Sequence, residues 1–122
     1  MNRSFSSRFF FGVLAFALFL LGGASSALAD AAAGATVYNA KCVSCHAKDG
    51  SGNTAVGKSL QSADLRSPEV QKKSDAELTE SISEGKGNMP AFKTMLSEDE
   101  IHSVLSYVRT LAPKGGAAPK KH

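Results

Sequence analysis

The sequence predicts an all-α fold of three to four short helices joined by long loops. Three observations lead to this expectation. Apolar residues between positions 101 and 111 recur at helical spacing, and serines stand where helix N-caps are expected. No segment alternates apolar and polar residues as a half-buried strand would. Aromatic residues are scarce after position 20, so a domain this small is expected to fill part of its core with something other than side chains.

The first 29 residues are expected to be a secretory signal peptide that is cleaved. Two arginines precede an apolar run over residues 9–21, and residues 27–29 (Ala-Leu-Ala) form an A-x-A-like cleavage site. The run is shorter than the roughly 20 residues that span a membrane, although an uncleaved anchor is the alternative. Cleavage would leave a helical domain at 30–113 and a flexible Gly/Ala/Pro/Lys tail at 114–122.

The net charge does not point to a nucleic-acid partner. The whole chain has 14 Lys and Arg against 11 Asp and Glu, a formal net charge of +3 at pH 7. Cleavage removes two arginines and leaves 12 basic against 11 acidic groups, with three of the lysines in the tail. The domain sequence lacks the basic stripe that nucleic-acid binding needs. We therefore expect no nucleic acid and, after cleavage, no stable membrane insertion.

Two helices are predicted in the first half of the domain. One covers residues 34–43, after a short mobile lead-in at 30–33. The other is short and begins at Ser67-Pro68, because serine is a good N-cap and proline suits the first helical position. Residues 47–63, rich in Gly, Ser and Asn, are predicted to form a long irregular loop. A loop of this length in a compact domain is uncommon unless it is functional or wraps something.

Two better-defined helices follow. One begins at Ser74 and ends before Gly85, and the other begins at Ser97 and ends at Pro113. Each of the two serines has a glutamate three residues later, which is the spacing of a capping box. Residues 85–95 between the two helices are predicted to be irregular.

The chemistry is indicated by Cys42-Val43-Ser44-Cys45-His46. This C-x-x-C-H pattern is typical of c-type haem attachment. Two cysteines three residues apart lie on one side of a helical turn, where they can form thioethers with the two vinyl groups at one edge of a porphyrin. His46 would then reach the iron as the proximal ligand. The predicted cofactor is one covalently attached haem c.

Three other interpretations of the two cysteines remain open. A structural disulfide is compatible with an exported chain. A redox pair of the thioredoxin type normally accompanies a βαβ pattern, which this sequence lacks. Zinc would need two more ligands, and only His102 and His122 remain.

The second axial ligand decides what the haem can do, and the candidates are Met89, Met95 and His102. Met89 precedes Pro90, which biases it toward an extended conformation, so its thioether would be presented from a loop. Met95 stands beside Leu96 and is expected in the core. His102 is expected on the flank of the last helix. We therefore predict that Met89 is the distal ligand.

In this order the motifs resemble those of class I c-type cytochromes, most closely the cytochrome c6 type. Gly34-x-x-x-Tyr38-x-x-x-Cys42 is similar to the family's N-terminal helix, and Met89-Pro90-Ala91-Phe92-Lys93 to its methionine loop. Leu96-Ser97-Glu98-Asp99-Glu100-Ile101 and Tyr107-Val108 are similar to its C-terminal helix. The matches run across nearly all of the mature chain. The resemblance implies a cytochrome c-like fold wrapped around one haem.

The resemblance also implies site residues and a function. Cys42 and Cys45 would form the thioethers, His46 would be the proximal ligand and Met89 the distal ligand. The chain would be a soluble exported carrier, not an enzyme, that shuttles single electrons between a redox protein donor and acceptor through transient docking. We expect a monomer in the periplasm, or in the thylakoid lumen of a photosynthetic host. A haem subunit of a larger oxidoreductase complex and a small haem peroxidase are the alternatives.

Packing contacts follow from the same resemblance. Gly34 would let the first helix cross closely against Tyr107 on the last, because a residue without Cβ allows backbone approach. Phe92 and Leu96 would pack near the haem.

The sequence departs from the family pattern at two points. Many members have a proline soon after the haem motif whose carbonyl accepts a hydrogen bond from the proximal imidazole, and here none occurs between His46 and Pro68. The partner of the second His46 nitrogen is therefore not identified by the sequence. The groups that bind the haem propionates are not evident either, and Lys58 and Arg66 are the candidates.

Overall fold

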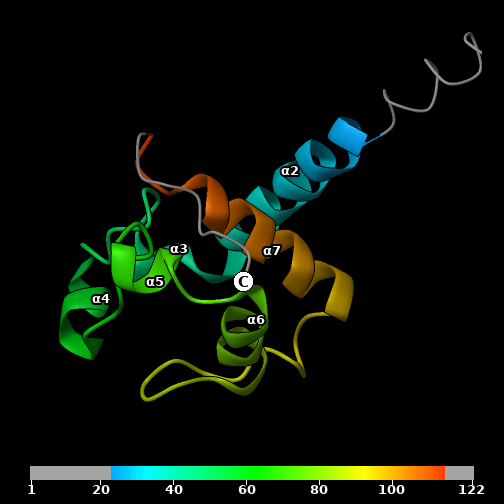
Figure 1. Cartoon of the computed structure of the whole chain (residues 1–122). Helices are drawn as coiled ribbons and strands as arrows, with labels where there is room; N and C mark the ends of the chain where they lie inside the picture. The colour runs from blue at the N-terminus through cyan, green and yellow to red at the C-terminus, as the bar shows by residue number, and fades with distance from the viewer. Residues whose placement is uncertain (1–22, 115–122) are drawn as a thin grey trace, which may run out of the picture.

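The computed structural model describes residues 23–114, and this part of the chain is helical (Figure 1). It contains, in order, α2 (Gly23–Lys41), α3 (Val43–His46), α4 (Ala55–Leu60), α5 (Pro68–Gln71), α6 (Asp75–Glu84) and α7 (Glu98–Thr110). Within these residues β-pairing is limited to an isolated bridge between Lys86 and Met89. The predicted all-α class is confirmed. Most of the predicted signal peptide, and the tail from residue 115 on, lie outside the described residues.

Helices α2 and α7 cross and form the main helix–helix contact of the domain (Figure 1). At the crossing, a Cβ on Gly34 would lie 1.8 Å from the Ser103 carbonyl oxygen, so only glycine fits. Tyr38, one turn further along α2, is completely buried against Val104. The close crossing expected at Gly34 is present, but its nearest neighbours on α7 are Ser103 and Val104, one turn before Tyr107. Tyr107 packs against Tyr38, with ring centroids 5.0 Å apart.

Helix α2 is longer than predicted. It begins at Gly23 rather than Gly34, and the expected lead-in at 30–33 is part of the helix. Residues 24–35 are rich in alanine, the best helix former, and contain no proline that would stop the helix. The helix ends at Lys41, and Cys42 is the N-cap of α3.

The segment predicted as one irregular loop contains the short helix α4. The Thr54 hydroxyl caps it by accepting a hydrogen bond from the Gly57 N–H at 2.8 Å. Gly57 packs so closely that a Cβ there would lie 2.2 Å from the Cys45 carbonyl oxygen. The prediction missed α4 because Gly and Ser disfavour helix, whereas contact with α3 selects it here.

The three helix starts predicted at serines are confirmed. The side chains of Ser67, Ser74 and Ser97 cap α5, α6 and α7, and the last two form complete capping boxes. Helix α7 ends at Thr110, three residues before Pro113, and buries the predicted apolar face. None of the helices in the described part of the chain is long and apolar enough to cross a membrane.

Candidate functional site

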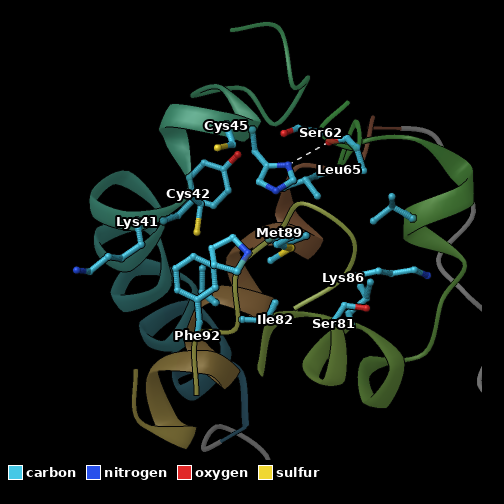
Figure 2. A pocket seen from close by; sticks show the side chains of 18 of the residues that line it. Lys41, Cys42, Cys45, Ser62, Leu65, Ser81, Ile82, Lys86, Met89 and Phe92 are labelled. Carbon is cyan, nitrogen blue, oxygen red and sulfur yellow. Dashed lines mark hydrogen bonds between the residues drawn. The ribbon is translucent and has the colours of Figure 1, made fainter. Parts of the chain in front are cut away.

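A cavity of about 540 Å³ lies between α3, the loop that carries Met89, and α6 and α7 (Figure 2). Its walls are mostly apolar. They include Leu65, Val70, Leu78, Ile82, Phe92 and Leu96. A cavity of this size and character is typical of sites for organic cofactors. Buried residues of two small hydrophobic clusters, one around Leu105 and one around Ile101, contribute to these walls.

Cys42 and Cys45 both line the cavity, from one turn at the start of α3. Both are half-buried and neither is in a disulfide, so the disulfide interpretation is not supported. Burial, with a smaller contribution from Cys45, raises the pKa of the Cys42 thiol to about 11, so this thiol is protonated at neutral pH. Among residues 23–114 no three His, Cys, Asp or Glu side chains gather as a zinc site requires.

The His46 ring is buried at the cavity wall and hydrogen-bonded through Nδ1. Nδ1 lies 3.1 Å from the carbonyl oxygen of Ala63 (dashed line in Figure 2). A carbonyl oxygen can only accept, so Nδ1 carries the proton and donates, and Nε2 keeps a free lone pair. Ala63 is therefore the partner that the sequence left unidentified. No sequence signal could have found it, because the acceptor is a backbone atom 17 residues away in an irregular segment.

The backbone around His46 is tied to the helical core. The Tyr38 hydroxyl donates to the Ala47 carbonyl oxygen at 2.7 Å, and the Gly52 N–H donates to the His46 carbonyl oxygen at 2.8 Å. Burial raises the pKa of Tyr38, which keeps this phenol protonated as a donor. The buried Tyr38 side chain thus connects the crossing of α2 and α7 to the backbone next to His46.

Met89 lines the same cavity from the loop between α6 and α7. Lys86 and Met89 exchange two backbone hydrogen bonds, of 3.1 and 3.0 Å, which close a tight four-residue turn. The Phe92 N–H donates to the Ile82 carbonyl oxygen at 3.0 Å and returns the chain to α6. The half-buried thioether of Met89 is therefore presented from a loop, as predicted, and these hydrogen bonds restrain that loop.

The other two candidate ligands lie elsewhere. Met95 was expected in the core, and this was wrong: it is 49% exposed and does not line the cavity, because Leu96 takes the buried position beside it. His102 is exposed on α7, as expected, and is not among the cavity residues either. Phe92 and Leu96 are buried and line the cavity, as the resemblance implied.

The charged residues that line the cavity are all cations. Lys41, Lys73 and Lys86 contribute to its wall, and no Asp or Glu does. The sequence-based candidates for the propionates, Lys58 and Arg66, are not among the residues that line it. The cavity therefore combines apolar walls, two thiols, one imidazole lone pair and one thioether with positive charge. This donor set fits a dianionic porphyrin whose iron takes one nitrogen and one sulfur ligand.

Comparison with known proteins agrees with this site. A family model described as cytochrome c oxidase, cbb3-type, subunit III matches residues 29–108. Cytochrome c6 of Leptolyngbya boryana is 44% identical over 87 residues, which cover 71% of this chain and 99% of the relative. Cytochrome c6 of a Synechocystis strain is 36% identical over 115 residues, covering 90% of this chain and 93% of the relative.

A solved structure is also similar. A protein described as KustC0563 c-type cytochrome superposes with a TM-score of 0.61 at 32% sequence identity. The match covers 66% of this chain and 98% of that one. Sequence and fold similarity thus extend over the same helical domain.

Proposed function

Because this chain belongs to the class I c-type cytochromes, close to cytochrome c6, we propose that Cys42, Cys45, His46 and Met89 hold the haem through which it carries electrons. As a member of this family it is a monohaem electron carrier with one covalently bound haem c, and not an enzyme. One observation supports the residue assignment above the others. Both cysteines, the imidazole and the Met89 thioether line a single apolar cavity.

Cys42 and Cys45 attach the haem in this proposal. Each thiol adds across one vinyl group: the sulfur bonds to one vinyl carbon, the thiol hydrogen ends on the other carbon, and no oxidant is consumed. Both cysteines are half-buried, neither is in a disulfide, and both lie on one turn at the start of α3, as attachment to one porphyrin edge requires. Covalent attachment suits a carrier outside the cytosol, where lost haem would not be replaced.

His46 and Met89 act as the axial ligands. The hydrogen bond from Nδ1 to Ala63 selects the tautomer in which Nε2 can coordinate iron, and holds the ring in one orientation. Met89 is a soft, neutral ligand, and such ligation gives a higher reduction potential than two imidazoles. With His46 and Met89 both bound to it, the iron would offer no free site to oxygen or peroxide.

The bound haem supplies a ferric/ferrous couple that takes one electron from a donor protein and gives one electron to an acceptor. The chain's own residues would make the surroundings mostly apolar and hold both ligands, so that little has to move on electron transfer. We propose that donor and acceptor dock transiently on a monomer. Small, wet contacts are typical of such redox encounters.

Lys73 and Lys86 are proposed to balance the haem propionates. Both line the cavity and both lie near Glu77, whose carboxyl pKa is lowered mainly by hydrogen bonds from Ser74 and to a smaller extent by these two lysines, so they share one region of the site. In Figure 2, Lys86 lies on the side of the cavity away from Cys42 and Cys45. The propionates of a porphyrin leave the ring at the edge opposite its vinyl groups, so this is where cations are needed.

Export to the periplasm, or to the thylakoid lumen in a photosynthetic host, is proposed from the signal-like residues 1–29. Cleavage before Asp30 would shorten α2 but leave its functional part, with Gly34 and Tyr38, intact. The domain would then comprise residues 30–113, followed by the Gly/Ala/Pro/Lys tail at 114–122. Mass spectrometry of the exported protein should give a mature N-terminus at Asp30, and retention of the first 29 residues would contradict the proposal.

A second candidate function is that of a haem subunit in a larger complex. The observation in its favour is the description of the matching family model, which names a subunit of a cbb3-type oxidase. Cell fractionation separates the two candidates. A free carrier appears in the periplasmic fraction and elutes at the mass of a monomer, whereas a subunit remains with a membrane complex.

Visible spectroscopy of the holoprotein tests the ligand assignment. The chain, expressed with its own first 29 residues in a host that makes c-type cytochromes, should show a low-spin six-coordinate spectrum in both oxidation states. A methionine–iron charge-transfer band should be present in the ferric form. This band should vanish in Met89→Ala.

Met95→Ala is the matched control, because it removes a similar side chain that lies outside the cavity. The charge-transfer band should persist in this variant. A high-spin spectrum of the unmutated protein, or rapid binding of carbon monoxide to its reduced form, would overturn the proposed closed coordination.

A further inference from the structure

We propose that Arg66, with Asp64 and Asp49, is a positioning residue for His46 that holds the Ala63 carbonyl against the imidazole ring. This inference rests on the proposed ligation of iron by His46. It gives a role to an ion-pair network outside the cavity, and it explains how the chain orients its histidine without a proline after the haem motif.

Ala63 needs such support because it lies in an irregular segment. Residues 62–67 join α4 to α5 and contain no helix, and the first proline after His46 is Pro68. A proline would restrict the backbone by itself, since its ring fixes φ. Without it, the carbonyl that accepts from His46 Nδ1 must be held by contacts from elsewhere.

Two backbone hydrogen bonds flank Ala63. The Ser62 N–H donates to the Gly57 carbonyl oxygen at 2.8 Å, and the Leu65 N–H donates to the Gly50 carbonyl oxygen at 2.8 Å. These bonds fix the segment at one point before and one point after Ala63. The stretch between them is short enough for a side-chain bridge to set its conformation.

The side-chain bridge between Asp64 and Arg66 follows Ala63 directly in the chain. Arg66 Nε and Nη2 donate to the two carboxylate oxygens of Asp64, each at 2.9 Å, and the Arg66 backbone N–H donates to Asp64 Oδ1 at 2.9 Å. Three hydrogen bonds between residues two apart close a rigid turn beside the carbonyl. A fork of this kind depends on the planar guanidinium, which lysine cannot reproduce.

The same guanidinium reaches the loop that follows His46. Arg66 Nη1 donates to Asp49 Oδ2 at 3.3 Å. Asp49 is itself held by Ser51, whose N–H and hydroxyl donate to Oδ1 at 3.1 and 2.6 Å. Arg66 therefore ties together the segment that carries the acceptor and the segment that carries the donor.

Loosening the network of Arg66, Asp64 and Asp49 should change the basicity of the His46 imidazole as an iron ligand. A well-formed hydrogen bond from Nδ1 to a carbonyl raises the basicity of a coordinating imidazole, which favours the ferric state. A looser Ala63 carbonyl should therefore make the reduction potential more positive. It should also let the Nδ1 proton exchange faster with solvent.

The test is Arg66→Lys in the holoprotein, with Arg109→Lys as the matched control. Both changes conserve charge, and Arg109 is another bridging guanidinium that donates to Asp75 and to the Gln71 and Lys73 carbonyls. In the reduced protein, NMR should show His46 Nδ1–H exchange faster by a factor of up to about five in Arg66→Lys, the scale of a half-exposed ion pair. Its potential should be more positive, and neither quantity should change in Arg109→Lys.

Asp64→Asn is the second variant, with Asp75→Asn as its charge-matched control. Asp64→Asn should also speed exchange of the His46 Nδ1 proton and make the reduction potential more positive, as in Arg66→Lys. If either variant lowers thermal stability but leaves the potential and the exchange rate unchanged, the network is only structural and the inference is overturned. Failure of the ligand assignment would look different, since the unmutated holoprotein would then lack a low-spin six-coordinate spectrum.

Discussion

Replacing Gly34 by alanine should weaken the packing that supports the haem site. A Cβ at this position would lie 1.8 Å from the Ser103 carbonyl oxygen and 2.9 Å from the Val104 nitrogen, whereas ordinary contacts begin at 3.4 Å. The clashing atoms belong to the backbone of α7, so no rotamer change can relieve the overlap. The two helices must move apart, which loosens Tyr38 against Val104.

The expected cost follows from two opposing effects. Overpacking a core typically costs about 1–3 kcal/mol, and a clash against rigid backbone belongs at the upper end of that range. Alanine gains roughly 0.5–1 kcal/mol over glycine in a helix, which offsets part of the cost. The net destabilisation is about 2 kcal/mol. For a domain of this size it corresponds to a decrease in Tm of roughly 8–16 °C.

Thermal unfolding of the holoprotein, followed by circular dichroism, measures this decrease. Thr36→Ala is the matched control, because it places alanine two residues away at an exposed position of the same helix. Its stability should remain within about 0.5 kcal/mol of the unmutated protein. If Gly34→Ala unfolds at the same temperature as Thr36→Ala, close contact between α2 and α7 is not needed for stability.

Three further outcomes are expected. Stability should fall as the pH decreases below about 4, because Arg66 lowers the pKa of Asp64 in the folded state and this carboxyl therefore takes up a proton on unfolding. In Asp64→Asn the free energy of unfolding should fall less between pH 4 and pH 2. Denaturant titrations at several pH values measure this, and the same pH dependence as in the unmutated protein would contradict it. Tyr38→Phe should cost about 1 kcal/mol, since it removes the 2.7 Å hydrogen bond to Ala47, and no change in urea midpoint would refute that role. Met95→Ala should change stability by less than about 0.5 kcal/mol, and a larger loss would mean that Met95 is buried.

Much of the helical framework could be predicted because its signals are local. Ser67, Ser74 and Ser97 cap helices as expected, since a serine hydroxyl and the N–H groups it satisfies lie within three residues of each other. The start of α2 and the existence of α4 were missed. The alanine-rich start of α2 favours helix, and the prediction began this helix too late. In α4, Gly and Ser disfavour helix, and packing against α3 decided the outcome.

The site could be predicted where one short motif carries the chemistry. Cys42, Cys45 and His46 are adjacent in sequence, so their convergence on one cavity needs only one helical turn. Met89 could be selected by its place before Pro90, and it lines the same cavity. Met95 as a core residue was wrong, and Lys58, a candidate for the propionates, lies in α4 and does not line the cavity. In both cases the residue type alone does not indicate which way the side chain points.

The sequence by itself determined the class of fold, the motif that binds the cofactor and the family of electron carriers to which the chain belongs. These depend on residue types at fixed short spacings, which persist whatever the rest of the chain does. Only the tertiary structure decided that Ala63 accepts the His46 hydrogen bond, that Arg66 reaches Asp49, and that lysines line the cavity. Such contacts join residues far apart in the chain through backbone atoms and side-chain directions. Both are set by packing, and neither leaves a pattern in a single sequence.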